Sequence, residues 1–192
     1  MEFVSHDEVA DLLDDYGIEE VVEGKERVHL RMTDGEGVVH LHLADRSCPS
    51  KPRNGASVVP IEKDRLPQAL EQILRALHLN QVLLLPVGKW RKVFDAVAFS
   101  LANNHAWQEM DATATVELNT RDPLVCEPAD FNTLIELVSA LIRDADSPEQ
   151  GLIFVATASP VLVEIIPDGA VRVSVGSPAL ADEVSEAFAK KA

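Results

Sequence analysis

The spacing of apolar residues near the N-terminus predicts a helix. Ser5 and Glu8 have the spacing of a capping box, which favours a helix that begins at this point. Gly17 is typical of the position just beyond a helix end, so the helix is expected to stop there. Its buried stripe follows a period of 3.6 residues and is expected to consist of Val9, Leu12, Leu13 and Tyr16.

The segment 28–45, VHLRMTDGEGVVHLHLAD, predicts a β-hairpin, because apolar and polar residues alternate on both sides of a glycine-containing centre. A tight loop at Gly35-Glu36 would join the two strands in the register that keeps both apolar sets on one face. In that register His29 lies opposite His42, and His40 lies on the same polar face. We therefore expect all three imidazoles to face water.

The remaining apolar pattern predicts further helices and strands along the chain. The stretch from Val93 to Ala102 is almost wholly apolar, so the helix that contains it is expected to be the most buried. Helices are expected over 64–79, 88–104, 130–145 and 178–191, and strands over 18–22, 81–87, 110–118, 151–158, 160–166 and 170–175.

These elements predict a single compact α+β domain over 1–192, in which about five or six helices flank antiparallel hairpins. The segment 45–62 is rich in Pro, Ser and Gly, which is typical of a long loop, and an internal domain boundary would fall there. Residues 5–79 and 130–190 have the same order of elements. This order suggests two similar α-β-β-β-α halves, although their residue identity is negligible.

The charge of the chain is strongly acidic and lies mainly at one end. The formal net charge is −15, and the first 24 residues hold nine acidic residues and neither Lys nor Arg. This charge argues against nucleic acid and anionic membrane surfaces as partners. The acidic start lacks the features of a signal peptide, there is no long apolar run, and there are only two cysteines. We expect a cytoplasmic protein.

The predicted hairpin raises the question of a metal site. His29, His40 and His42 on one face could converge on a metal ion such as zinc, which needs three or four ligands held close together. Arg31, opposite His40 in the same register, would disfavour a bound cation. The alternative is a solvent-facing hairpin whose polar face carries imidazoles, and the pattern favours this alternative.

The segment 86–92, PVGKWRK, is a second candidate site. A buried strand leads into a helix whose first turn carries three cations, although cations there oppose the helix dipole. Free amides and cations together would suit an anion such as a phosphate or a carboxylate. The alternative is a basic surface patch that complements the acidic N-terminal helix of the same chain or of a second copy. The anion site would consist of Gly88, Lys89, Arg91 and Lys92.

The acidic N-terminal helix is the third candidate site. Its carboxylates repel one another, so a basic protein partner would gain binding energy by relieving this repulsion. The alternative is an ordinary solvated helix face. The partner-binding residues would be Asp7, Glu8, Asp11, Asp14 and Asp15.

No sequence motif indicates catalysis. The chain lacks a Walker A loop, G-x-G-x-x-G, G-x-S-x-G, H-E-x-x-H and C-x-x-C, and Cys48 and Cys126 have no histidine nearby in the sequence. We expect no cofactor and no catalytic residue. The sequence favours a non-catalytic cytoplasmic interaction module, such as an adaptor, chaperone or regulator, that uses its acidic helix. The alternative is a small-anion or metal-binding protein, or an enzyme, with a site at 88–92 or on the histidine face.

Overall fold

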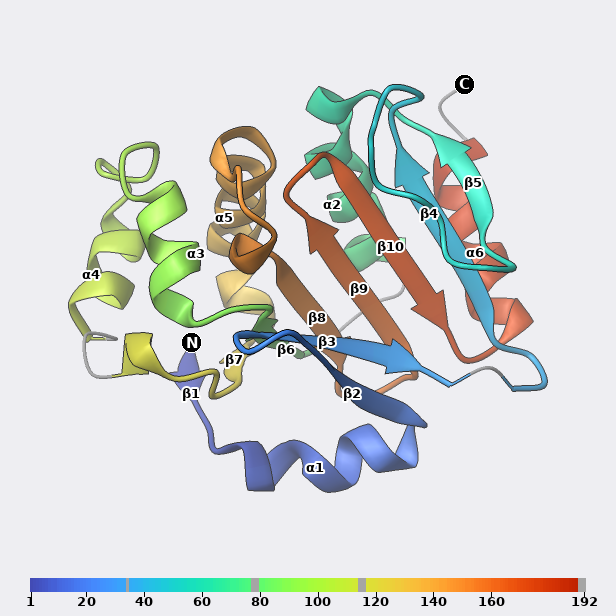
Figure 1. Cartoon of the computed structure of the whole chain (residues 1–192), viewed down its shortest axis with the longest axis horizontal. Helices are drawn as coiled ribbons and strands as arrows, with labels where there is room; N and C mark the ends of the chain where they lie inside the picture. The colour runs from blue at the N-terminus through green and yellow to red at the C-terminus, as the bar shows by residue number, and fades with distance from the viewer. Residues whose placement is uncertain (34, 77–79, 114–116, 190–192) are drawn as a thin grey trace.

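The computed structural model describes residues 1–33, 35–76, 80–113 and 117–189 and is built on one large mixed sheet. Eight strands lie in the order β1-β7-β6-β8-β9-β10-β4-β5 (Figure 1). All neighbours are antiparallel except β4 and β5. The strands are β1 (Glu2–Phe3), β4 (Val39–Ala44), β5 (Ser57–Pro60), β6 (Val82–Pro86), β7 (Leu124–Cys126), β8 (Leu152–Ala156), β9 (Val161–Ile166) and β10 (Ala170–Val175).

Two further strands, β2 (Ile18–Glu23) and β3 (Arg27–Met32), form a separate antiparallel pair. The described residues also form six α-helices and four short 3-10 helices. The α-helices are α1 (His6–Asp15), α2 (Leu66–Ala76), α3 (Trp90–Val97), α4 (His105–Thr113), α5 (Phe131–Asp144) and α6 (Pro178–Ala189). The 3-10 helices are η1 (Lys63–Arg65), η2 (Glu117–Asn119), η3 (Pro128–Asp130) and η4 (Pro148–Gln150).

The main sheet separates two apolar cores, because successive side chains of a strand point to opposite faces. One face packs against α2, α3, α5 and α6 and contributes residues such as Leu84, Phe154 and Val173. The other face contributes residues such as Leu85 and Ile153 and is covered by α1 and the β2-β3 pair. Figure 1 shows α1 below the sheet, and β2 and β3 crossing in front of β8 and β9.

Most of the predicted elements are confirmed. The Ser5–Glu8 capping box begins α1, and Gly17 follows the helix with a φ of 61°. The predicted elements at 64–79, 81–87, 130–145, 151–158, 160–166, 170–175 and 178–191 correspond to η1 with α2, β6, η3 with α5, β8, β9, β10 and α6. Residues 77–79, 190 and 191 of these predictions lie outside the described residues. The described residues form the predicted α+β class, with six α-helices.

The predicted hairpin over 28–45 is wrong. The first half, β3, pairs with β2, so that Val28 lies opposite Val22. The second half, β4, pairs with β10, so that His42 lies opposite Arg172 rather than His29. The period-two pattern indicates which face of a strand is apolar, but it does not specify the strand to which it pairs.

The predicted strand over 110–118 is also wrong, and the predicted helix over 88–104 is too long. Asn104 Oδ1 accepts a hydrogen bond from the Trp107 amide at 2.9 Å, and α4 begins at His105 and runs through Met110. Residues 114–116 lie outside the described residues. The helix α3 ends at Val97, and Phe99 beyond it is 95% exposed. The apolar run there is therefore only partly buried.

The two predicted halves share the order of their elements but differ in strand pairing. The strands β8, β9 and β10 are neighbours in the main sheet, whereas in the first half β2 and β3 stand apart from that sheet and β4 and β5 belong to it. The loop at 45–62 contains β5, which pairs in parallel with β4 and forms one edge of the main sheet. In the part of the chain that the structure describes, no helix is both long and apolar enough to cross a membrane.

Candidate functional site

A cavity of about 420 Å³ lies between the N-terminal elements and the main sheet. Its apolar part comes from Val28 and Leu30 of β3, Leu85 and Pro86 of β6, and Ile153 of β8. Leu30, Leu85 and Ile153 are buried because they also belong to the core under α1. The cavity is thus a gap that remains where the β2-β3 pair crosses the sheet.

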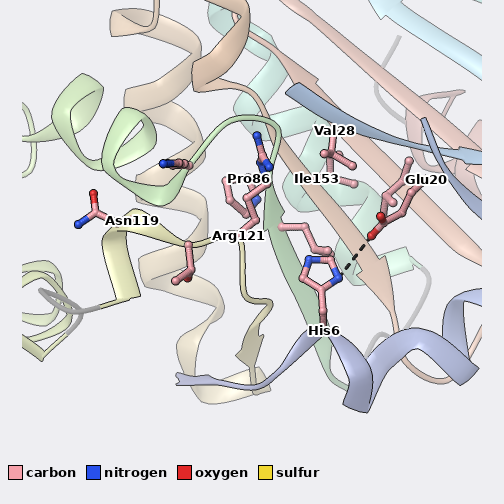
Figure 2. Close-up of a pocket in the computed structure, with 11 residues that line it drawn as sticks. His6, Glu20, Val28, Pro86, Asn119, Arg121 and Ile153 are labelled. Carbon is pink, nitrogen blue, oxygen red and sulfur yellow. Dashed lines mark ion pairs between the residues drawn. The ribbon is translucent and has the colours of Figure 1, made fainter. Parts of the chain in front are cut away.

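Charged side chains surround this apolar part. Figure 2 shows His6 and Glu20 on one side of the cavity and Arg121 across from them. His6 Nδ1 is 3.3 Å from Glu20 Oε1. Arg121 Nε donates to the Gly88 carbonyl at 2.9 Å, and Nη2 donates to the Glu26 carbonyl. Arg121 therefore ties the β2-β3 turn to the start of α3 and places its positive charge at the cavity.

Only one of the four predicted anion-site residues lines this cavity, namely Lys89. The Gly88 amide already donates to the Glu149 carbonyl, and the Trp90 amide donates to the Thr120 carbonyl. Lys92 Nζ lies 3.7 Å from Glu149 Oε2, and Arg91 does not line the cavity. Two of the amides expected to hold an anion are thus engaged within the protein. Arg121, Asn119 and Thr120, which sequence reasoning missed, contribute the other polar groups on that side.

The three histidines of the predicted metal site do not lie on one face of a single hairpin. His29 lies on β3, where its Nδ1 is 2.6 Å from Glu164 Oε1 and its Nε2 is 3.2 Å from Glu23 Oε2. His40 and His42 lie on β4, and His40 Nδ1 is 2.8 Å from Ser174 Oγ. Among the described residues, no group of three or more His, Cys, Asp or Glu side chains could hold a metal ion.

His42 is only 2% exposed, so the prediction that its imidazole faces water is wrong. Burial lowers its pKa, the positive charge of Arg172 lowers it further, and a hydrogen bond with the Ser50 backbone and the charge of Asp168 oppose this shift. The imidazole is therefore neutral at pH 7. The His42 side chain is buried because β4 lies inside the main sheet, between β10 and β5, and its ring contacts the Ser50 backbone.

A buried carboxylate, Glu164 of β9, organises this part of the molecule and was missed by sequence reasoning. Glu164 is 3% exposed, and its Oε2 lies 3.3 Å from Arg172 Nη1 and 3.4 Å from Arg53 Nη2. Together with His29, these contacts join β3, β10 and the 45–56 loop to β9. The sequence signal was a single charge in each of two apolar strands, PVLVEII and AVRVSV, which the register places opposite each other.

The environment of Glu164 keeps it ionised. Burial raises the pKa of its carboxyl, but the hydrogen bond from His29 and the positive charges of Arg172, His29 and Arg53 together bring that pKa below its ordinary value. The ionised carboxylate can only accept hydrogen bonds, so His29 Nδ1 carries the proton that it donates to Glu164.

The acidic residues of α1 form an exposed surface. Asp7, Asp11, Asp14 and Asp15 are exposed and have helical spacing that places them on one face, and none of them has an ion-pair partner within the described residues. Glu8 differs from them, because its carboxylate accepts hydrogen bonds from the Ser5 amide and hydroxyl.

The neighbouring strand β2 continues this surface. Its carboxylates are exposed but paired, since Glu19 contacts Arg31, Glu20 contacts His6, and Glu23 contacts Arg27 and His29. Within the described parts of the chain, β2 pairs only with β3, so its other edge carries no strand. We call the α1 face with this edge of β2 the acidic surface.

Both cysteines are free thiols in environments that suppress ionisation. Burial raises the pKa of Cys126 to about 12, with a smaller contribution from the charge of Asp130, and burial also raises the pKa of the partly exposed Cys48. Because the thiolate is the reactive form, Cys126 should stay unmodified by iodoacetamide at pH 8 in the folded protein, while Cys48 is modified slowly. Mass spectrometry of labelled peptides checks this, and unfolding in urea should expose both. Equal labelling of Cys126 in folded and unfolded protein would contradict its burial.

Searches of protein-family models, of curated proteins and of solved structures found no match to this chain. Two features of the chain itself point to a function, namely the acidic surface on the outside of the N-terminal elements and the cavity on their inner side.

Proposed function

We propose that this protein is a non-catalytic cytoplasmic interaction module, of the adaptor, chaperone or regulator type, that binds a basic segment of another protein at the acidic surface. The observation that carries the proposal is the unpaired edge of β2 beside four carboxylates of α1 that lack ion-pair partners among the described residues. Figure 1 shows α1 running along the same side of the molecule as β2.

The chemistry of the surface favours an extended basic segment. An unpaired strand edge presents backbone N–H and C=O groups that an added strand can satisfy. Val22 of β2 is 67% exposed and offers an apolar contact to such a strand. Lysine or arginine side chains of the added strand would reach the α1 carboxylates and relieve their mutual repulsion.

The same charges disfavour the other occupants. If β2 of a second copy paired with this edge, Glu19, Glu20 and Glu23 of each copy would come close to like charges. Nucleic acid and anionic membrane surfaces would meet the same repulsion. A partner with basic side chains is the one occupant that gains from both the edge and the charge.

A synthetic ten-residue peptide of alternating Lys and Val tests the proposal. It should bind the full chain, shift the NMR amide signals of β2 and α1, and bind less tightly as salt is added. Reversing charge with Asp11→Lys and Asp14→Lys should weaken binding by about tenfold or more, equivalent to about 1.4 kcal/mol. Fluorescence anisotropy of the labelled peptide measures the affinity.

Two controls make the result specific. The variant with Asp182→Lys and Glu183→Lys makes the same change in net charge on exposed positions of α6, and it should bind the peptide like the wild type. A peptide with alternate backbone amides N-methylated cannot form the strand hydrogen bonds. Equal binding of the N-methylated peptide, or equal weakening by the α6 variant, would count against the proposed docking mode.

A further inference from the structure

The cavity on the inner side of the β2-β3 pair combines an apolar floor with an excess of positive charge. Lys89 and Arg121 line it as permanent cations, and Glu20 is the one carboxylate among the described residues of its lining. We infer that this cavity binds a small monoanionic carboxylate with an apolar body, as a second binding site that shares only Glu20 with the acidic surface. The inference does not depend on the proposed function, because it concerns the inner side of the N-terminal elements.

The size and floor of the cavity suit a small amphipathic molecule. Ligand pockets usually enclose about 300–1,000 Å³ and combine an apolar lining with a few polar groups. The volume of about 420 Å³ falls within this range. Figure 2 shows Val28 and Ile153 close together above His6, where an apolar ligand body would lie, while Leu30 and Leu85 complete the floor.

The charges in the cavity lining specify one negative charge on the ligand. Glu20 is ion-paired with His6, so its carboxylate is already in contact with a polar partner. Lys89 makes no ion pair with any residue that the structure describes, and Arg121 makes only two hydrogen bonds there, both to carbonyl oxygens. Lys89, Arg121 and Glu20 together leave one net positive charge, which a single carboxylate would balance. Its oxygens can accept hydrogen bonds from Lys89 and from the N–H groups of Arg121 that do not donate to the two carbonyls.

This positive site is unusual for its setting. The chain carries a net charge of −15, and repulsion from the other acidic groups would weaken binding of any anion that gained only charge contacts. The apolar floor supplies the additional affinity, because burial of a hydrocarbon body is favourable whatever the net charge of the protein. For this reason the inferred ligand is an amphipathic carboxylate rather than an inorganic anion.

Titration of the full chain with octanoate tests the inference. Octanoate should shift the NMR amide signals of Val28, Arg121 and Ile153, whereas octanamide, its neutral analogue, should bind at least about tenfold more weakly. Inorganic phosphate should give no comparable shifts at these residues. The inference would be overturned if octanamide, or inorganic phosphate, bound as tightly as octanoate.

Two variants at the start of α3 provide a matched pair. Lys89→Gln removes an exposed cation that lines the cavity, and Arg91→Gln removes an exposed cation from the same turn that does not. Octanoate affinity should fall several-fold in the first variant and stay unchanged in the second. Both positions are exposed, so both variants should fold, which their amide spectra check. Equal affinities of the two variants would overturn the assignment of the anion site.

A cavity-filling variant tests the apolar floor separately. Ile153→Trp should abolish octanoate binding, because the larger side chain occupies the space of the ligand body. If this variant fails to fold, the affinity of the wild type for carboxylates with hydrocarbon chains of different length tests the floor instead. Affinity should then rise from butanoate to octanoate, and equal affinity for both carboxylates would overturn the role of the floor.

Discussion

Replacing Glu164 by glutamine should destabilise the protein by about 3 kcal/mol. Glu164→Gln keeps the shape of the side chain but leaves Arg172 and Arg53 without their shared carboxylate. Removing one partner of a buried ion pair typically costs about 3–5 kcal/mol. We expect the lower end of this range, because the two arginines keep some contact with water. Urea unfolding followed by circular dichroism measures the change.

The same contacts predict a dependence of stability on pH. Because the pKa of the folded Glu164 carboxyl lies below its ordinary value of 4.5, its ionised form stabilises the folded state fully above that pH. This stabilisation should disappear as the pH falls through the lowered pKa of the folded state. Glu164→Gln should therefore lose much of the acid dependence that the wild type shows below about pH 4.5.

A matched control separates burial from simple loss of charge. Glu19→Gln also removes a carboxylate paired with an arginine, Arg31, but both partners are more than half exposed. Exposed ion pairs contribute about 0–1 kcal/mol, so this variant should unfold at nearly the wild-type urea concentration. If the two variants were equally stable, Glu164 would not hold β3 and the 45–56 loop to the sheet in the way described.

Replacing Trp90 by alanine should destabilise the protein by about 3–5 kcal/mol, the usual cost of removing a large buried aromatic side chain. Trp90 is fully buried and lies 5.7 Å from Phe3 and 6.1 Å from Phe94, measured between ring centroids. Its Nε1 donates to the Asp122 carbonyl at 2.8 Å. The variant Trp90→Ala would therefore leave both a cavity and a carbonyl without its partner. Urea unfolding again measures the loss.

Phe99→Ala is the control for Trp90→Ala. Phe99 lies in the same predicted helix but is 95% exposed, so its removal should change the free energy of unfolding by less than about 0.5 kcal/mol. A loss at Phe99 comparable to that at Trp90 would show that Phe99 is buried in solution, for example against a second copy of the chain. Sedimentation of both variants would then detect that association.

The sequence predicted the elements whose signals are local. The capping box at Ser5 and Glu8 involves residues three positions apart, and the apolar spacing of α2 and α5 lies within each helix, so each can be recognised without its partners. The strands β6 and β8 were recognised as continuous apolar runs, which is typical of strands buried on both faces.

The errors arose where a local pattern allowed more than one arrangement. The apolar alternation of β3 and β4 fits pairing with each other as well as with β2 and β10, and the glycines between them favoured the hairpin. In α4, alternation around Met110 was compatible with a strand. A helix forms instead, because Asn104 accepts a hydrogen bond from the Trp107 amide at its start, and Trp107 and Met110, three positions apart, are both buried on one face.

The candidate sites depended on the tertiary structure to different degrees. Exposure of the α1 carboxylates follows from the helical period, so the acidic surface could be predicted except for the free edge of β2. The cavity could not be predicted, because its lining combines side chains such as His6, Leu85 and Arg121 that are far apart in the sequence. Only Lys89 among the predicted anion-binding residues belongs to it.

The sequence by itself determined the α+β class, the boundaries of the capped helices and which side chains of most strands point inward. These properties depend on the backbone period and on interactions among residues a few positions apart. The tertiary structure alone decided which strands pair, that His42 is buried, and that Glu164 meets His29, Arg53 and Arg172. Most of these contacts, such as those of Glu164 with His29 and Arg53 and the pairing of β4 with β10, join segments more than a hundred residues apart. Their choice depends on how the whole chain packs rather than on any local pattern.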